Sequence, residues 1–157
     1  MIVMRRLRRK LKRPKEPWYA PRIEDEKKIL SKYGLRRKKE IWRAQEILRN
    51  FRRRARELNA VANEKEEKIL IDKLSRLGVL PEKADLDDVL ALDVYSILDR
   101  RLQSVVCRKK MAETPLQARQ IIVHGKVLVN GVRVKFPSYI VPVEEERSIH
   151  VKAGGKS

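Results

Sequence analysis

The stretch "ARQIIVHGKVLVNG" (residues 118–131) changes from a helical to a strand pattern halfway along its length. Ile121-Ile122 follows polar residues, as in the last turn of a helix, and His124-Gly125 predicts a corner in the left-handed conformation that glycine tolerates. The residues after this corner alternate in hydrophobicity as far as Asn130-Gly131, a dipeptide typical of a tight hairpin turn. A helix, a glycine corner and a hairpin are therefore expected in immediate succession.

The residues before this stretch predict two helices. "TPLQ" (residues 114–117) has Thr in the N-cap position, Pro in the first helical position and Gln in the third, which is typical of a helix start. "SILDRRLQSVVCRKK" (residues 96–110) is predicted as one continuous helix with its aliphatic residues directed inward. Arg100 and Arg101 are expected on the outward side of this helix.

The residues after the glycine corner predict a small sheet. In the hairpin "KVLVNGVRV" (residues 126–134), the valines of the two strands are expected to face one another across the Asn-Gly turn. "PSYIV" (residues 137–141) and "RSIHV" (residues 147–151) are predicted as two further short strands, with "EEE" (residues 144–146) in the turn between them.

A long amphipathic helix is predicted nearer the N-terminus. In "KKEIWRAQEILRNFRRRARELNA" (residues 38–60), apolar residues recur every three or four positions, which predicts one buried stripe. The stripe consists of Ile41, Ala44, Leu48, Phe51, Ala55 and Leu58.

Three shorter helices accompany the long one in this prediction. One runs from about Ile23 to Tyr33 and ends at Gly34. Asn63 with Glu66, and Asp85 with Asp88, have the spacing of capping boxes at the starts of two more. Ile69, Leu70, Leu74 and Leu77 are expected on the apolar face of the first of these two helices, which Gly78 and Pro81 end.

Charge is the strongest compositional signal. The 157 residues include 39 Lys and Arg against 21 Asp and Glu, a formal net charge of +18, which favours a polyanionic partner such as nucleic acid. One cysteine, Cys107, excludes an intramolecular disulfide and indicates a reducing compartment. No apolar run approaches the roughly 18 residues of a membrane span, and no secretory signal is evident. A cytosolic protein without membrane contact is expected.

The positive charge is concentrated in two regions. Residues 1–56 carry 22 basic and 6 acidic side chains, and residues 100–157 carry 12 and 4, whereas residues 57–99 carry 5 and 11. The first region opens with a proline-punctuated basic arm, in which Trp18 and Tyr19 could stack on bases or sugars. On the long helix, "RRR" (residues 52–54) places like charges side by side, which favours phosphate contact over a merely solvated face.

No residue pattern supports catalysis or metal binding. The acidic residues Asp85, Asp87, Asp88 and Asp93 are explained by their positions in or before first helical turns. The C-terminal "GGKS" lacks the remaining glycine and the following helix of a phosphate-binding loop, and Cys107 is interpreted as a small core residue. We therefore expect no enzymatic activity, no metal and no cofactor.

A resemblance to a known family joins these elements. "ILDRRL", "TPLQARQIIVHG", "KVLVNG" and "PSYIV", in that order, resemble the small RNA-binding module of the ribosomal protein S-four family. The basic arm, "YGLRRKKEIWRAQEILRNFRRRAREL" and "DVLALDVYSILDRRL" are similar to the archaeal form of that family. The resemblance therefore covers nearly the whole chain.

The resemblance implies both an architecture and a function. The fold class is α+β, with a basic arm (residues 1–22), a helical region (residues 23–93) and an RNA-binding module (residues 94–157). The implied function is a cytoplasmic structural component of the small ribosomal subunit that binds small-subunit ribosomal RNA directly and helps to nucleate assembly. The implied place is near the channel by which messenger RNA enters. The implied partners are small-subunit ribosomal RNA, neighbouring small-subunit ribosomal proteins and messenger RNA at that channel.

Two alternatives stay open at this point. Similar modules occur in RNA-modifying and aminoacylating enzymes, but a catalytic domain does not fit in the rest of this chain. A non-ribosomal RNA-binding factor for ribosome processing or rescue is the other, and the long helical region argues against it.

The predicted RNA-binding residues are cations, with a few polar or aromatic neighbours, on the arm, the long helix and the module. They are Arg5, Arg6, Arg8, Arg9, Lys10, Trp18, Tyr19, Arg36, Arg37, Lys38, Lys39, Arg43, Arg49, Arg52, Arg53, Arg56, Arg100, Arg101, Arg108, Lys109, Lys110, Thr114, Gln117, Arg119, Gln120, His124, Lys126, Arg133 and Tyr139.

Overall fold

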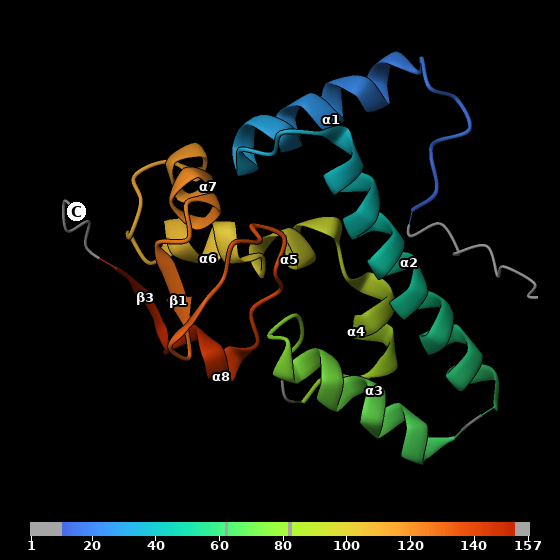
Figure 1. Ribbon diagram of the computed structural model, residues 1–157. Coiled ribbons are helices and arrows are strands. Elements are labelled where there is room, and N and C mark those ends of the chain that lie inside the picture. Colours follow the sequence, from blue (N-terminus) through green and yellow to red (C-terminus); the bar gives the residue numbers. More distant parts are fainter. Residues whose placement is uncertain (1–10, 62, 82, 153–157) are drawn as a thin grey trace, which may run out of the picture.

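The fold is a helical region joined to a small α+β module, as the computed structural model shows (Figure 1). The structure describes residues 11–61, 63–81 and 83–152. Along the chain the elements are α1 (Ala20–Tyr33), α2 (Lys38–Val61), α3 (Glu64–Arg76), α4 (Leu86–Ala91), α5 (Val94–Asp99), α6 (Leu102–Arg108), α7 (Pro115–Val123), β1 (Val127–Val129), β2 (Val132–Arg133), α8 (Val143–Glu146) and β3 (Ile149–Val151). The predicted α+β class is confirmed.

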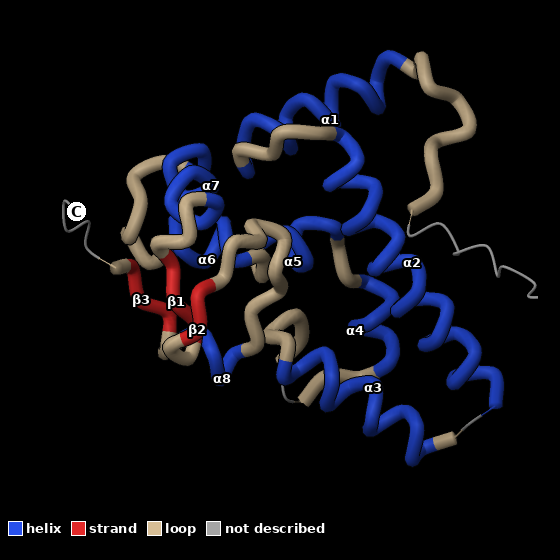
Figure 2. The backbone as a smooth tube through the Cα atoms, in the orientation of Figure 1, coloured by secondary structure: helices blue, strands red, loops and turns tan. Residues whose placement is uncertain are grey.

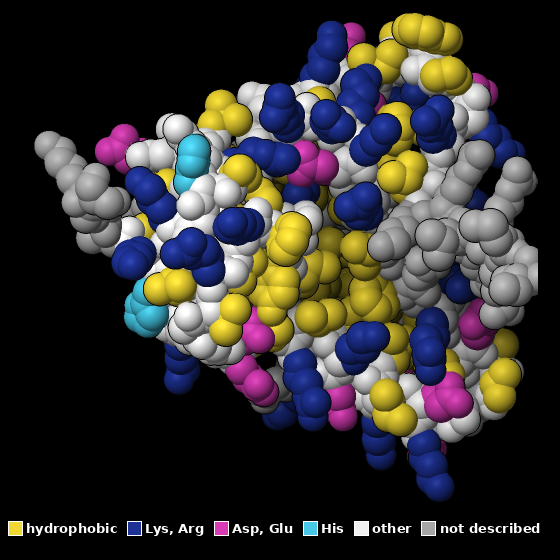
Figure 3. Space-filling view, viewed as in Figure 1, with side chains coloured by type: hydrophobic (Ala, Val, Ile, Leu, Met, Phe, Trp, Pro, Cys, Tyr) yellow, Lys and Arg dark blue, Asp and Glu magenta, His cyan; other side chains and the backbone are white. Residues whose placement is uncertain are grey.

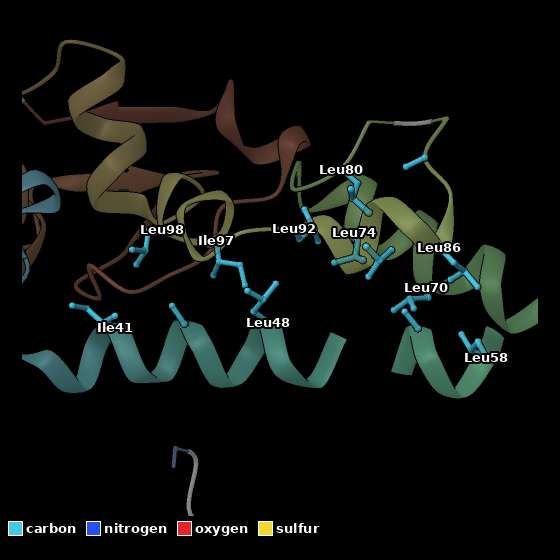
Figure 4. Packing of buried hydrophobic residues seen from close by; sticks show 14 of the residues in the cluster. Ile41, Leu48, Leu58, Leu70, Leu74, Leu80, Leu86, Leu92, Ile97 and Leu98 are labelled. Atoms are coloured by element: carbon cyan, nitrogen blue, oxygen red, sulfur yellow. The ribbon is translucent and has the colours of Figure 1, made fainter. Parts of the chain in front are cut away.

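The long helix α2 is the spine of the helical region. Its predicted apolar stripe is confirmed, because five of the six residues are buried and Phe51 is half-buried. Figure 4 shows Ile41, Leu48 and Leu58 directed from α2 toward leucines and an isoleucine of the following helices and their connections. The spacing of apolar residues in the sequence thus determines which side of α2 is covered by protein.

Helix α1 was predicted correctly at its C-terminal end but not at its start. Gly34 follows α1 in the left-handed conformation, with φ of 57°, and its N–H and that of Leu35 bond to carbonyls of the last helical turn. The helix begins at Ala20, earlier than the predicted Ile23, because Pro21 lies within its first two positions, where a missing N–H costs nothing.

Capping predictions for α3 and α4 had opposite outcomes. The capping box at Asp85 is supported, since its N–H donates to the Asp88 carboxylate at 3.0 Å. The one predicted at Asn63 is wrong, because that side chain makes no cap hydrogen bond. Ile69 was also wrongly placed on the buried face of α3, since it is 62% exposed, whereas Leu70 and Leu74 are buried.

The module contains a three-stranded antiparallel sheet in the order β2-β1-β3 (Figure 2). The predicted hairpin is confirmed, with Val129 opposite Val132 and with Asn130 and Gly131 at positive φ in the turn. The glycine corner is confirmed as well, since Gly125 has φ of 68° after the end of α7.

The helix predicted over residues 96–110 is interrupted. α5 ends at Asp99 and α6 begins at Leu102, because the intervening backbone pairs with the segment after β2. Arg101 forms an isolated antiparallel bridge with Ile140, and the Leu102 N–H donates to the Tyr139 carbonyl at 2.7 Å. The segment "PSYIV" is accordingly used for this bridge and does not form the predicted strand.

The turn predicted at residues 144–146 is a short helix, α8. Pro142 precedes it, and three glutamates occupy its first turn. Carboxylates are stabilised there by the positive end of the helix dipole. Of "RSIHV", only Ile149–Val151 forms a strand, which pairs with β1.

Two hydrophobic clusters underlie this arrangement. One joins α1 to α5 and includes Leu98, whereas the other begins at Leu102 and includes the core of the module. This division favours a boundary just after α5, so we propose to move the predicted boundary at residue 93 to that point. The other predicted divisions, including the arm ending at residue 22, stay predictions. Within the described ranges, no helix is long and apolar enough to cross a membrane.

Candidate nucleic-acid interface

A hollow lies where the helical region meets the module. It is lined by Arg36, Arg37, Glu40 and Arg43 around the start of α2, by Arg101 and Arg119 of the module, and by the loop residues Pro137 and Ser138. Figure 3 shows a depression in this face of the molecule, with hydrophobic side chains inside it and Lys and Arg side chains around it. The structure thus brings together five arginines that the sequence spreads over more than eighty positions.

Glu40 organises two of these arginines. Its Oε2 accepts hydrogen bonds from Arg101 at 2.5 Å and from Arg119 at 3.1 Å, and its Oε1 accepts a second bond from Arg119 at 3.0 Å. Burial acts to raise the pKa of Glu40, but the hydrogen bonds from Arg119 and Arg101 outweigh it and lower the pKa below the usual value. Glu40 is therefore ionised at neutral pH and holds both guanidinium groups in fixed orientations.

The other three arginines of the hollow are exposed. Arg36, Arg37 and Arg43 make no ion pair with any residue in the described part of the chain. One glutamate faces five arginines, so the hollow keeps an excess of positive charge after its internal pairs are formed. Such an excess in a concave site attracts anions.

Several predicted RNA-binding residues make contacts that hold α8 in place. Arg100 is 7% exposed and donates to Glu146 and to the Val141 carbonyl, both at 2.7 Å. Arg108 donates to the same carboxylate at 2.8 Å, and Lys109 donates to the backbone carbonyl of Glu146. The expected outward position of Arg100 is wrong.

Arg101 was likewise expected to point outward and is 5% exposed. It is buried because the chain breaks its helix at this point and turns the side chain toward Glu40. Tyr139 is half-buried and donates to Glu145 at 2.6 Å; that hydrogen bond, with burial, raises the pKa of Tyr139 to about 12.

The positive charge on the basic face of α2 is partly neutralised by ion pairs and hydrogen bonds within the protein. Lys38 pairs with the buried Glu26 at 3.2 Å, Arg49 pairs with Glu46, and Arg53 lies 3.8 Å from Glu57. Arg52 is half-buried and donates to the Leu92 carbonyl, while Arg56 donates to the Arg52 carbonyl at 3.3 Å. Lys39 is exposed.

The module presents a second group of polar side chains to solvent. Lys110, Gln120, His124, Lys126 and Arg133 are exposed around the glycine corner and the hairpin. Thr114 caps α7 by accepting from the Gln117 N–H at 3.2 Å, and the Gln117 side chain accepts from the Glu113 N–H at 2.8 Å.

The predicted arm residues are only partly described. Trp18 and Tyr19 are 88% and 54% exposed, as base stacking would require. Arg5, Arg6, Arg8, Arg9 and Lys10 lie outside the described residues. RNA contact by the predicted residues as a set stays a prediction.

Sequence reasoning missed two residues, Glu40 and Gln103, whose hydrogen bonds join the helical region to the module. Glu40 was overlooked because it stands among cations, although a lone carboxylate between "RRKK" and Arg43 is a signal for internal pairing. Gln103 was overlooked because an amide within a helix carries no local signal. It is 1% exposed, and its Nε2 donates to carbonyls of the α1–α2 turn and of α7.

Acid should weaken the ion pairs that Glu40 and Glu146 form with arginines, and so lower the stability of the fold. Burial acts to raise the pKa of Glu146, but Arg100 and Arg108 outweigh it, so its pKa is lowered, as for Glu40. A carboxylate with a lowered pKa in the folded state contributes stability above its unfolded pKa of about 4.3 and loses it as the pH falls through the folded value. We expect the free energy of unfolding in urea to drop steeply below about pH 4.

The double variant Glu40→Gln/Glu146→Gln should be less stable at neutral pH and should show a shallower acid dependence. Glu57→Gln is the matched control, because Glu57 is exposed and lies 3.8 Å from Arg53. If the stability of the double variant fell with acid as steeply as that of the wild type, Glu40 and Glu146 would not be the source of the acid dependence.

The described residues contain no cluster of three or more His, Cys, Asp or Glu side chains that could hold a metal ion. Cys107 is half-buried and packs against the module core, as expected.

Comparison with known proteins agrees with this architecture. Residues 100–146 match the S4 domain family. The chain is similar to proteins named small ribosomal subunit protein uS4. It is 50% identical over 149 residues to that of Methanococcus aeolicus, covering 92% of this chain and 84% of the relative. For Ignicoccus hospitalis the identity is 47% over 148 residues, covering 92% and 89%, and for Nanoarchaeum equitans it is 48% over 153 residues, covering 93% and 84%.

The fold and the hollow therefore define an α+β protein built around an S4 domain, with a helical region packed against it. The identities and coverage go further, because they extend over nearly the whole chain. The chain belongs to the small ribosomal subunit protein uS4 family, in its archaeal type, and the resemblance noted in the sequence is confirmed.

Proposed function

We propose that the protein is a structural component of the small ribosomal subunit and binds its RNA, with phosphate groups held in the hollow between α2 and the module. Its relatives are named as small ribosomal subunit proteins, which supports both a position in the small subunit and a non-enzymatic role. The small subunit is a cytoplasmic particle. The observation that carries the RNA contact is the convergence of five arginines on one hollow with a single carboxylate.

The chemistry of the hollow suits a phosphate backbone. Arginine forms bidentate, charge-assisted hydrogen bonds to phosphate, and these are stronger when the guanidinium is already oriented. Glu40 orients Arg101 and Arg119 from behind, while Arg36, Arg37 and Arg43 remain exposed at the rim. The hollow joins residues of both regions, so a bound strand would also fix the module against the helical region.

Removing rim arginines should weaken RNA binding and reduce its salt dependence. Each lost phosphate contact lowers the slope of log affinity against log salt by about 0.7 to 0.9. The double variant Arg36→Ala/Arg37→Ala should therefore lose about 1 to 3 kcal/mol per contact and show a slope shallower by about 1.5. The measurement is filter binding of small-subunit ribosomal RNA transcribed from the Methanococcus aeolicus sequence, across a salt series.

Arg76→Ala is the matched control, because Arg76 is an exposed arginine at the end of α3 and lines a different groove. Equal slopes for wild type, double variant and control would mean that the hollow does not bind phosphate. Both altered arginines are exposed, so the double variant should keep the wild-type unfolding midpoint.

A wider role follows from the same proposal. We infer that the protein binds early in subunit assembly and contacts neighbouring small-subunit proteins, with messenger RNA near its exposed basic face. The alternative is a transient non-ribosomal factor. Sedimentation of the protein with small subunits through a high-salt wash distinguishes them, because a transient factor would be released.

A further inference from the structure

The loop that closes the hollow carries an exposed aromatic ring. Phe136 is 71% exposed and directly precedes Pro137 and Ser138, both of which line the hollow. Two other aromatic side chains from this part of the chain have partners, since Tyr139 donates a hydrogen bond to Glu145 and Tyr95, on α5, packs near Tyr33. No such contact is found for Phe136 among the described residues. Phe136 itself is not among the residues that line the hollow, but its exposed ring is next in the chain to one that does, so it is free to contact a ligand that occupies the hollow.

The backbone holds this ring in a fixed place. The Tyr139 N–H donates to the Phe136 carbonyl at 3.1 Å, which closes a turn, and the Gln103 N–H donates to the Pro137 carbonyl at 3.4 Å. The Leu102 N–H donates to the Tyr139 carbonyl at 2.7 Å. The loop is thus attached to the start of α6, and the ring is presented on an ordered support.

The lining of the hollow changes from charged to mainly apolar beside this loop. Beyond its arginines it continues over a more apolar surface that includes Ala44, Ile47, Ile97 and Ile140. The two parts share Glu40, Arg43, Arg101 and Ser138. Figure 3 shows hydrophobic side chains inside a rim of Lys and Arg side chains on this face of the molecule. Phosphate gains nothing from apolar surface, whereas the face of an unstacked base does.

We propose that the strand crossing this hollow is unpaired there and that one of its bases stacks on Phe136, while its phosphates contact the rim arginines. The inference rests on the proposed function and adds the kind of RNA that is bound. The base faces of an A-form duplex are covered by their neighbours, so an aromatic ring can stack only on a nucleotide from a loop, bulge or single strand. Lys135, which precedes Phe136 in the chain, is also exposed and is a further cation available for phosphate contact.

The experiment compares four proteins on the same RNA, the small-subunit ribosomal RNA transcribed from the Methanococcus aeolicus sequence. Phe136→Ala should bind roughly 5- to 150-fold more weakly, the range for the loss of one base–aromatic stack, and Phe136→Trp should bind like the wild type. Val132→Ala is the matched control, since Val132 is an apolar module residue of similar exposure, 66%, and should bind normally. Phe136→Ala should also keep the wild-type salt slope, because no cation is lost.

The contact can be located independently. Ultraviolet crosslinking of the wild-type complex, read by mass spectrometry, should join Phe136 to one nucleotide, and chemical probing of the free RNA should show that nucleotide unpaired. A crosslink to a nucleotide within a duplex would overturn the proposal.

The outcomes separate this inference from the proposed function. Normal RNA affinity of Phe136→Ala would overturn the stacking proposal, and so would a defect seen only when other small-subunit proteins are added, which would assign the ring to a protein contact. If the rim arginine variants alone lost affinity, the proposed function would stand and the stacking would fail. If neither the Phe136 variants nor the rim arginine variants lost affinity, the assignment of the hollow as the RNA-binding site would be wrong.

Discussion

Replacing Gln103 by leucine should lower the free energy of unfolding by about 3 to 5 kcal/mol, as the sum of several buried groups left unsatisfied at about 1 to 3 kcal/mol each. The Gln103 Nε2 lies 3.0 Å from the carbonyl oxygens of Tyr33 and Gly34 and 2.8 Å from that of Pro115. Leucine has a similar volume but donates nothing, so these carbonyls would lose their partner without gaining water. The measurement is the urea midpoint at constant slope.

The size of this effect depends on burial, and Gln117→Leu is the control that tests it. Gln117 is exposed, so the same chemical change there should cost less than about 1 kcal/mol. Gln103→Glu should be at least as harmful as Gln103→Leu, because a carboxylate would face several carbonyl oxygens and the Arg119 contact alone would favour it. A Gln103→Leu variant within about 1 kcal/mol of the wild type would show that water replaces the amide.

The prediction for Gln103 illustrates what the sequence does not contain. The α2 stripe, the Asn130-Gly131 hairpin, the Gly125 corner and the Thr114 cap depend on residues within a few positions of one another, and all four were predicted. The break between α5 and α6 depends instead on a bridge to Ile140, about forty residues further along the chain. Local hydrophobic periodicity favoured one helix there, and tertiary pairing overrode it.

The candidate site also has features that the sequence predicts and features that depend on distant residues. Composition and charge distribution predicted that cations would gather on α2 and on the module. They could not predict which cations would be neutralised, because the partners are distant: Glu40 pairs with Arg119, 79 positions away, and Glu146 pairs with Arg100, 46 positions away. Arg119 was expected to lie on a free polar face, yet it is held by a carboxylate of the helical region, so its loss should affect folding as well as RNA binding.

Replacing Gly34 by alanine should destabilise the fold by about 2 to 4 kcal/mol, the combined cost of a left-handed residue and of displaced backbone. Gly34 has φ of 57°, and a Cβ atom there would lie 2.9 Å from the Cβ of Pro115 and 3.1 Å from the backbone nitrogen of Leu116. These atoms belong to the first turn of α7, which Thr114 caps, so they cannot move without opening the junction between the two regions.

Gly131→Ala separates the two contributions. Gly131 also has a positive φ, 76°, but no atom lies within 4 Å of the position that its Cβ would occupy. It should therefore cost only the conformational strain, about 1 kcal/mol, in the same urea titration. The excess destabilisation of Gly34→Ala over Gly131→Ala then measures how tightly α1 and α7 are packed. Equal losses at the two glycines would mean that α7 yields freely at this contact, and the hollow that depends on the same junction would be a deformable surface before RNA binds.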